Sequence, residues 1–226
     1  VVLGIGANEN IVALIKESLQ TDKKIENFPT INKFSMEGDR IIDSSAPFAY
    51  VKIADGCNNR CSYCAIPLIR GPFKSRKKED ILNEIHHLAE NGVREVNLIA
   101  QDTTNYGSDI YGEFKLPELI EDISKIDKIK WIRILYCYPD HITEELIEEI
   151  KNNPKVVKYF DIPLQHISDS VVKRMNRKSN SESIKKLINK IRKEIPDVIL
   201  RTSLIVGFPG ETKEDFEELY QFVKET

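Results

Sequence analysis

Cys57, Cys61 and Cys64 form one CxxxCxxC run, and this run constrains the chain more than any other feature. Cysteine thiolates are the usual ligands of iron-sulfur clusters, so the run can hold three irons of a [4Fe-4S] cluster. The fourth iron then has no ligand from the run, and an open metal position is where chemistry takes place. The expected occupant is S-adenosylmethionine (SAM), which can chelate that iron through its amino and carboxylate groups.

Three other uses of the cysteine run are weaker. The chain has four cysteines among 226 residues, whereas disulfide frameworks belong to small secreted domains. A structural zinc site usually pairs two cysteine knuckles, but Cys137 stands alone, as a buried apolar residue would, and His86 and His87 fall on a predicted helix. A ferredoxin-type cluster would need a fourth cysteine at a fixed spacing, which the run does not provide.

The composition predicts one large domain and no membrane span. The chain is 41% apolar and has a formal charge of −3, so it can bury a sizeable core and has no overall basic character for nucleic acid. No run of about 18 apolar residues and no signal peptide is visible. With unpaired cysteines, this predicts a cytoplasmic protein. The start at Val1 and a helical pattern over residues 216–226 lead us to expect a piece of a longer protein.

Strand-like and helix-like segments alternate from residue 50 onward. We interpret residues 1–45 as the tail of a preceding domain and a linker. The predicted strands lie at residues 50–54, 95–100, 130–136, 156–162 and 198–206, with helical patterns between and after them. Repeated β/α units imply parallel strands. We therefore predict an α/β fold, a partial TIM-like (βα) barrel whose functional residues lie at the carboxyl ends of the strands.

Cap signals mark several of the predicted helix boundaries. Thr143 and Thr212 are expected to cap the helices that follow them, and Ser168 and Ser181 to start two others. Gly92, after Asn91, marks the end of the helix that follows the cysteine run.

Polar residues follow the predicted strands and would meet on the rim that carries the cysteine run. They lie at residues 101–104, 138–140, 163–166 and 207–211. Gln101 and Asp102 are the stronger candidates for SAM contacts because they directly follow an apolar strand. Gly207 and Gly210 would let the backbone approach a nucleoside closely.

Five other polar residues on this rim have structural alternatives. Thr103, Thr104 and Asp140 can equally serve as helix caps. His166 fits a cap or core position as well as a ligand position. Glu211 is expected to serve the N-terminus of the following helix.

Two basic groups, at residues 70–78 and 173–178, lie beside the cysteine run and the loop after the fourth predicted strand, residues 163–166. Charge runs of this kind are usually solvated surface. Their position beside the expected cluster also allows contact with an acidic substrate or with RNA.

Several segments resemble a known family. The segments GCNNRCSYCAIP at residues 56–67 and IVGFPGET at residues 205–212 resemble the methylthiotransferase branch of the radical SAM enzymes. Within that branch, the member that methylthiolates an aspartate of ribosomal protein S-twelve is favoured by residues 101–107, 133–139, 161–169 and 201–202. The resemblance covers residues 48–226.

The resemblance implies a set of site residues. Cys57, Cys61 and Cys64 would bind the [4Fe-4S] cluster. The SAM pocket would be formed by Tyr63 near the adenine, by Gln101 and Asp102 near the methionine end, and by Gln165, Arg201 and the Gly207 loop.

The resemblance also implies what surrounds this chain. Residues 46–226 would be the radical SAM domain, truncated before the last strand of the family's barrel. A second [4Fe-4S] cluster would belong to a missing N-terminal methylthiotransferase domain, and a C-terminal TRAM domain would also be absent. The implied partners are ribosomal protein S-twelve or the small ribosomal subunit, and a low-potential electron donor such as a flavodoxin or ferredoxin-like protein, with no membrane.

The implied reaction starts when the reduced cluster cleaves SAM to methionine and a 5′-deoxyadenosyl radical. This radical removes a hydrogen from the aspartate β-carbon, which then receives a methylthio group assembled at the second cluster. Two alternatives remain: a tRNA adenosine methylthiotransferase, and a non-catalytic iron-sulfur or electron-transfer module. The mass gained by the substrate distinguishes the first, and the effect of SAM on the cluster spectrum distinguishes the second.

Overall fold

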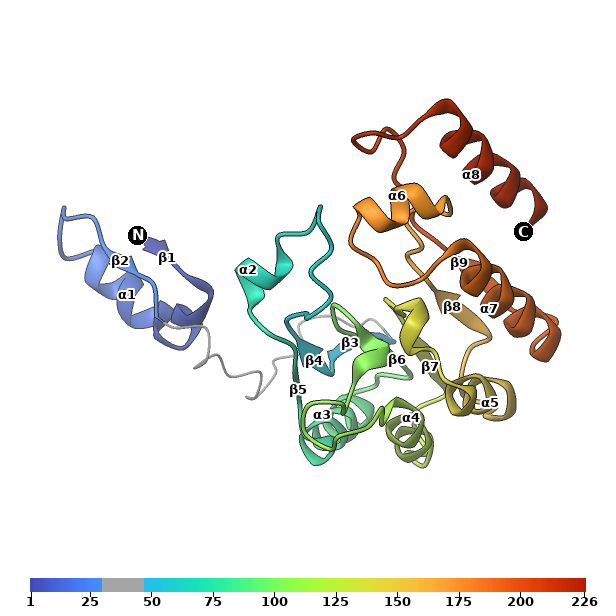
Figure 1. The fold of residues 1–226 in the computed structure, drawn as a ribbon. Coiled ribbons are helices and arrows are strands. Elements are labelled where there is room, and N and C mark those ends of the chain that lie inside the picture. Colours follow the sequence, from blue (N-terminus) through green and yellow to red (C-terminus); the bar gives the residue numbers. More distant parts are fainter. Residues whose placement is uncertain (30–46) are drawn as a thin grey trace.

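Five parallel strands form the framework of the chain. The computed structural model describes residues 1–29 and 47–226. The strands are β3 (Phe48–Lys52), β6 (Glu95–Ile99), β7 (Trp131–Ile134), β8 (Tyr159–Asp161) and β9 (Ile199–Arg201). They pair in parallel in the order β3-β6-β7 and β8-β9. A parallel bridge between Ile132 and Val156 connects the two groups, so the strands form one curved row (Figure 1).

Helices connect successive strands and lie along the outer side of the row (Figure 1). They are α3 (Lys78–Glu90), α4 (Leu116–Ser124), α5 (Glu144–Asn152) and α7 (Ser181–Glu194). The short α6 (Asp169–Arg174), which precedes α7, lies at the rim end of the row (Figure 1), and α8 (Lys213–Glu225) follows β9. The cap of α5 is confirmed, because the backbone N–H of Leu146 donates to Thr143 Oγ1 at 3.2 Å. Thr212 likewise caps α8. Helix α7 starts at Ser181 as predicted, and Asn180 is its cap.

The core lies between the outer face of the strands and these helices. Alternate strand residues point to opposite faces, and the buried set includes Val51, Val96, Ile132 and Phe160. These side chains belong to one large apolar cluster with Ile81, Ile85, Leu88, Leu119, Ile120, Ile147, Ile150, Ile184 and Ile188 from the helices. The opposite, concave face carries partly or largely exposed residues such as Tyr50, Arg133 and Arg201.

A short hairpin and three short helical turns complete the rim. Strand β4 (Ala54–Asp55) pairs antiparallel with β5 (Lys74–Ser75), and α2 (Ile66–Arg70) lies between them in the chain. Turn η3 (Thr103–Asn105) follows β6, and η4 (Pro139–His141) follows β7. These elements place the cysteine run and the residues after β6 and β7 at the same end of the row.

Residues 1–29 form a small unit of their own. Its parallel strands β1 (Val2–Leu3) and β2 (Glu26–Asn27) are connected by η1 (Ile5–Asn10) and α1 (Ile11–Ser18). Most of the predicted linker, and the predicted boundary at residue 46, lie outside the described residues.

The predicted α/β class and parallel strands are confirmed, but the strands are shorter than expected. The fourth predicted strand, residues 156–162, contains only the three-residue β8 and an isolated bridge at Val156. The fifth contains β9 and an isolated bridge between Leu204 and Gln165. In the described part of the chain the row stays open rather than closing into a barrel. No described helix has the length and apolar character needed to cross a bilayer.

Candidate functional site

The three predicted ligand cysteines lie in one loop between β4 and α2. Each of Cys57, Cys61 and Cys64 is half-buried. The backbone N–H of Cys57 donates to the carbonyl of Gly71 at 3.2 Å, and that of Cys64 donates to the carbonyl of Cys61 at 3.0 Å. The backbone N–H of Asn59 points at Cys57 Sγ at 3.5 Å. These backbone bonds help to fix the shape of the loop that carries the three thiols.

Gly56 opens the cysteine loop in a conformation that other residues rarely adopt. Its φ of +74° lies in the left-handed region, and a Cβ at this position would approach the carbonyl oxygen of Pro72 to 2.2 Å. The two sides of the hairpin can come this close only because residue 56 has no side chain. The glycine before the first cysteine is thus a requirement of the loop's shape.

The cysteine loop also contacts the segment after α6. Ser62 donates its backbone N–H to the carbonyl of Met175 at 3.0 Å and its hydroxyl to the carbonyl of Arg174 at 2.9 Å. The side-chain amide of Asn176 donates to the carbonyl of Arg60 at 2.9 Å. These bonds connect the loop after the first parallel strand to the segment after the fourth.

The carboxylate of Asp102 is hydrogen-bonded to the same loop. This carboxylate is almost fully buried, and Oδ2 accepts hydrogen bonds from Asn59 Nδ2 at 2.9 Å and from His141 Nδ1 at 3.0 Å. Oδ1 accepts from the hydroxyl of Thr104 at 2.9 Å. The hydroxyl of Thr103 donates to the carbonyl of Leu135. Because both hydroxyls are donors in these bonds, neither Thr103 nor Thr104 acts as a helix cap.

Gln101 is the candidate with an unused polar atom. Its side-chain oxygen, Oε1, is buried and has no hydrogen-bond partner among the described residues. A buried acceptor without a donor costs about 1–3 kcal/mol, so a ligand that brings an N–H group would remove this cost. The ammonium of an amino acid is a donor of this kind.

Tyr63 and the Gly207 loop meet over the cysteine loop. The ring of Tyr63 packs edge-on against Phe208, with centroids 6.4 Å apart. Arg177 Nη1 donates to the Tyr63 hydroxyl at 3.3 Å, and burial raises the pKa of Tyr63 to about 12. Gly207 has a φ of +73° and open space where a Cβ would lie. The two segments together form an aromatic surface that is partly open to solvent.

Gln165 and Arg201 lie where β8 and β9 end. Gln165 has a φ of +71°, and its carbonyl accepts the N–H of Ile205 at 2.7 Å. Arg201 Nη1 donates to the buried Asp161 Oδ1 at 2.6 Å. The hydrogen bonds of these two residues tie β8 to β9 and do not reach the cysteine loop.

His166 and Glu211 differ from a simple cap arrangement. His166 is fully buried, and its Nδ1 accepts the backbone N–H of Ser168 at 3.1 Å. Glu211 does not serve the N-terminus of α8, so that prediction is wrong. Its Oε2 accepts the N–H of Phe208 at 2.8 Å, and its Oε1 lies 3.5 Å from His166 Nε2. The physical reason is that Thr212 and Asp215 already satisfy that helix terminus.

Sequence reasoning missed several residues that shape this site. Asn59 lies inside the cysteine run, and its polar side chain between two predicted ligands is the available signal. Arg76 and Arg177 belong to the two basic groups, but both are buried, so solvated surface is the wrong interpretation for them. Arg177 also lies over the ring of Tyr138, 4.6 Å from its centroid. Asp161 gave no signal beyond its position at a strand end.

The donor set fits an iron-sulfur cluster better than a single metal ion. Among residues 1–29 and 47–226, no three His, Cys, Asp or Glu side chains lie close enough to share one ion. A [4Fe-4S] cluster binds each thiolate to a different iron, so its ligands need not converge on a point. Burial first, and then the charges of Asp102, Cys61 and Cys64, raise the pKa of Cys57. Soft sulfur donors in one half-buried loop match the cluster.

Comparison with known families decides the identity of this fold. Residues 51–223 match the Radical SAM superfamily. The chain belongs to the radical SAM superfamily. The solved structure of the radical SAM methyltransferase TsrM from Kitasatospora setae, with cobalamin and a [4Fe-4S] cluster bound, has a TM-score of 0.63, and 79% of this chain aligns with 34% of it at 16% identity. Coproporphyrinogen III oxidase (HemN) from Escherichia coli gives a TM-score of 0.58, with 79% of this chain aligned to 42% of it at 19% identity. Both show the radical SAM fold.

Curated relatives are much closer in sequence. "Ribosomal protein uS12 methylthiotransferase RimO" of Alkaliphilus oremlandii is 55% identical over 216 residues, which are 94% of this chain and 49% of the relative. The protein of the same name from Clostridium tetani is 51% identical over 225 residues, which are 100% of this chain and 51% of the relative. The chain spans about half the length of the curated relatives it matches.

Proposed function

We propose that this chain is the radical SAM core of a methylthiotransferase that modifies the β-carbon of an aspartate in ribosomal protein uS12, the S-twelve protein of the small subunit. The observation that carries the proposal is the cysteine loop, which Gly56, Asp102 and the segment after α6 hold in one shape. Identity of 55% to RimO of A. oremlandii over 94% of this chain supports the substrate. The enzyme is then a transferase.

In this proposal the cofactors are a [4Fe-4S] cluster and SAM. Cys57, Cys61 and Cys64 hold three irons of the cluster. When bound, the cluster and SAM supply one-electron cleavage of the sulfonium and hydrogen abstraction from the substrate. The chain itself binds the two groups, orients them and excludes water from them.

The described contacts suggest how the residues of the rim share the binding of SAM. Gln101 offers its unpaired buried oxygen to the ammonium of the methionine end. Tyr63 and the Gly207 loop offer an aromatic ring and open backbone to the adenosine. Asp102 remains near the methionine end, but its oxygens already accept three hydrogen bonds, so it acts through Asn59 as a positioning residue. Gln165 shapes the far side of the rim through its backbone.

The whole protein extends beyond this core in the proposal. Residues 1–45 are the tail of the N-terminal methylthiotransferase domain and a linker, and residues 46–226 are the radical SAM domain. The N-terminal domain holds the second [4Fe-4S] cluster, where the methylthio group is assembled, and a TRAM domain follows the core. The partners of the whole protein are uS12, free or in the small subunit, and a low-potential electron donor such as flavodoxin or ferredoxin. The protein and these partners lie in the cytoplasm.

Anaerobic reconstitution tests the cofactor part of the proposal. Residues 1–226 should bind about four irons per chain, and SAM should change the electron paramagnetic resonance signal of the reduced cluster. Cys61→Ala should lose both properties. A Cys61→Ala variant that kept a full, SAM-responsive cluster would exclude the assignment, and a wild-type cluster that ignored SAM would favour an electron-transfer module.

Mass spectrometry tests the substrate. The full-length enzyme, with both clusters intact, should add a methylthio group to an aspartate of uS12 and leave tRNA adenosine unmodified. The basic groups at residues 70–78 and 173–178 are the feature that could favour RNA. Methylthiolated adenosine in a tRNA digest, without any mass gain on uS12, would replace this function by the tRNA-modifying one.

A further inference from the structure

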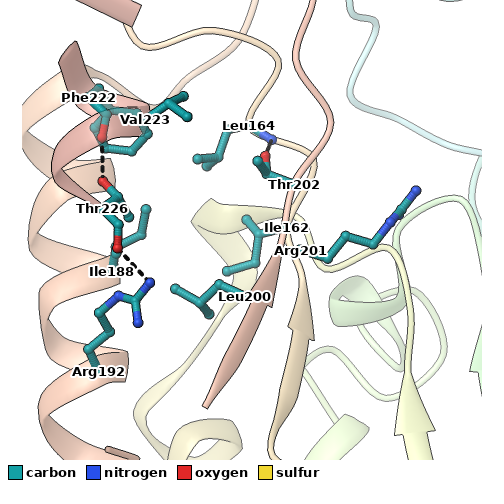
Figure 2. Close-up of a pocket in the computed structure, with 10 residues that line it drawn as sticks. All are labelled: Ile162, Leu164, Ile188, Arg192, Leu200, Arg201, Thr202, Phe222, Val223 and Thr226. Atoms are coloured by element: carbon teal, nitrogen blue, oxygen red, sulfur yellow. Dashed lines mark hydrogen bonds between the residues drawn. The ribbon is translucent and has the colours of Figure 1, made fainter. Parts of the chain in front are cut away.

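The concave face of the strand row presents an arginine at the end of β9. Leu200 points outward and lines an apolar pocket with Ile188 of α7 and Phe222 of α8. Its neighbour Arg201 also borders this pocket, but because strand residues alternate, its side chain turns toward the other face. Figure 2 shows the Arg201 side chain extending away from the apolar residues of that pocket. About 54% of this side chain is exposed.

Asp161 fixes the Arg201 guanidinium in place. This carboxylate is 2% exposed, and its Oδ1 accepts Arg201 Nη1 at 2.6 Å. Its Oδ2 accepts the backbone N–H of Tyr136 at 3.3 Å. Tyr136 itself has a φ of +61° and an exposed ring. One buried carboxylate therefore joins the ends of β7, β8 and β9 and sets the direction of an exposed cation.

Arg201 keeps most of its hydrogen-bonding capacity. A guanidinium has five N–H donors in a planar fork, and among the described residues Arg201 uses one of its nitrogens, in the bond to Asp161. The other arginines near the concave face are more fully engaged. Arg133 donates to Glu95 at 2.8 Å and lies 5.2 Å from the ring centroid of Tyr159. Arg177 is buried and donates to Tyr63 and to the carbonyl of Pro163.

A held guanidinium with free donors is suited to an oxyanion, a carboxylate or a phosphate, which it can bind through two parallel hydrogen bonds, and the reacting group of the proposed substrate is a carboxylate. Two molecules of the proposed reaction carry one: the aspartate of the substrate and the methionine part of SAM. The hydrogen bonds of Arg201 lie within the ends of β7, β8 and β9, whereas those of the cysteine loop run to Asp102 and to the segment after α6. This separation favours the substrate.

We propose that Arg201 binds the side-chain carboxylate of the aspartate that is modified. This inference rests on the proposed function. The carboxylate is one bond from the β-carbon, so fixing it also fixes the direction of the β-hydrogens that react. The assignment departs from the sequence expectation that Arg201 completes the SAM pocket.

The test measures substrate binding and SAM binding separately, in the full-length enzyme with both clusters. Its probes are uS12 and uS12 with the target Asp replaced by Asn. The variants are Arg201→Gln and Arg201→Lys, and the matched control is Arg192→Gln, an exposed arginine of α7 that donates to the carbonyl of Thr226 at 2.7 Å. We expect Arg201→Gln to weaken uS12 binding at least about tenfold and to remove the preference for Asp over Asn. Arg201→Lys should retain part of the affinity for uS12 and part of the preference for Asp over Asn.

Affinity for SAM, the cluster spectrum and the melting temperature should match those of the Arg192→Gln control. If Arg201→Gln weakened SAM binding and left uS12 binding intact, the carboxylate would belong to SAM and the proposal would fail. If neither affinity changed, Arg201 would be only the partner of Asp161. A wild-type enzyme that adds no methylthio group to uS12 overturns the proposed function itself, whereas an active wild type with an unaffected variant overturns only this inference.

Discussion

The side-chain amide of Asn59 donates a hydrogen bond of 2.9 Å to the buried carboxylate of Asp102, which lies 43 positions further along the chain. This bond fastens the middle of the cysteine loop to the end of β6. The same carboxylate also bonds the hydroxyl of Thr104 and Nδ1 of His141. The rings of Phe114 and Tyr138 pack against His141. The position of the predicted iron ligands therefore depends on one buried carboxylate.

Replacing Asp102 should damage both folding and cluster assembly. In Asp102→Ala, Asn59, Thr104 and His141 lose their shared acceptor, and we expect the free energy of unfolding to fall by about 3 kcal/mol. Urea denaturation of the apoprotein would measure this loss. The iron content after reconstitution should also fall, because the cysteine loop is no longer held.

Two further variants separate this role from a general effect of lost charge. Asp140→Ala removes an exposed carboxylate from η4 and should change stability by less than about 0.5 kcal/mol. Asp102→Asn keeps one acceptor oxygen and should fall between the two. Full iron content in Asp102→Ala would show that the loop holds its shape without this contact.

Local features of the site could be predicted from the sequence. The cysteine run, the caps at Thr143 and Thr212, and the helix end at Gly92 depend on neighbours within a few positions, and each of them lies where the sequence places it. Parallel strands followed from the β/α alternation. Strand lengths did not, because the apolar stretches continue through the bridges at Val156 and Leu204.

Long-range contacts could not be predicted in the same way. Arg177 and Arg76 look like members of charged surface runs, and only the packed fold buries them beside tyrosines and carbonyls. Asp161 gains its role because the register of β8 and β9 places it opposite Arg201. Sequence spacing carries no information on such pairs. The predicted SAM contacts at Tyr63, Gln101, Asp102, Gln165, Arg201 and Gly207 stay predictions.

A comparison of two glycines tests the shape of the cysteine loop. Gly56 and Gly112 both have a positive φ, +74° and +78°, but a Cβ on Gly56 would lie 2.2 Å from a carbonyl oxygen, whereas nothing lies within 4 Å at Gly112. Gly112→Ala should therefore cost only the roughly 1–2 kcal/mol of the left-handed backbone. Gly56→Ala should cost clearly more and should lower iron binding. Equal melting temperatures for the two variants would contradict the close approach.

The fourth cysteine should behave differently from the other three. Cys137 is fully buried, and burial raises the pKa of its thiol, with the charges of Asp161 and Asp102 adding to the effect. In the folded apoprotein, iodoacetamide should modify Cys57, Cys61 and Cys64 and spare Cys137, as read by mass spectrometry of peptides. Denatured protein, in which all four react, is the control.

Removal of Cys137 should be mild. Cys137→Ala should keep the iron content and SAM cleavage of the wild type and should lose about 1 kcal/mol of stability. Loss of iron in this variant would show that Cys137 is a cluster ligand after all.

Asp215 connects the start of α8 to the start of α6. Its Oδ1 accepts the hydroxyls of Ser168 and Ser170, and its Oδ2 accepts the backbone N–H of Thr212 at 3.0 Å. These hydrogen bonds hold the pKa of the Asp215 carboxyl well below its usual range, and the bond from Ser168 has the largest effect. Because the pKa is lower in the folded than in the unfolded chain, the ionised carboxylate stabilises the fold above the unfolded pKa of about 3.9.

That stabilisation should be lost as the pH falls from about 4 toward the lower pKa of the folded state. We expect the wild-type apoprotein to lose stability over this range and Asp215→Asn to lose less, because the variant has no proton to take up at this position. Urea denaturation at a series of pH values measures both slopes. Glu214→Gln is the matched control, since Glu214 is a neighbouring exposed carboxylate of the same helix turn, and it should keep the wild-type slope. Parallel slopes for wild type and Asp215→Asn would show that these hydrogen bonds do not favour the charged carboxylate.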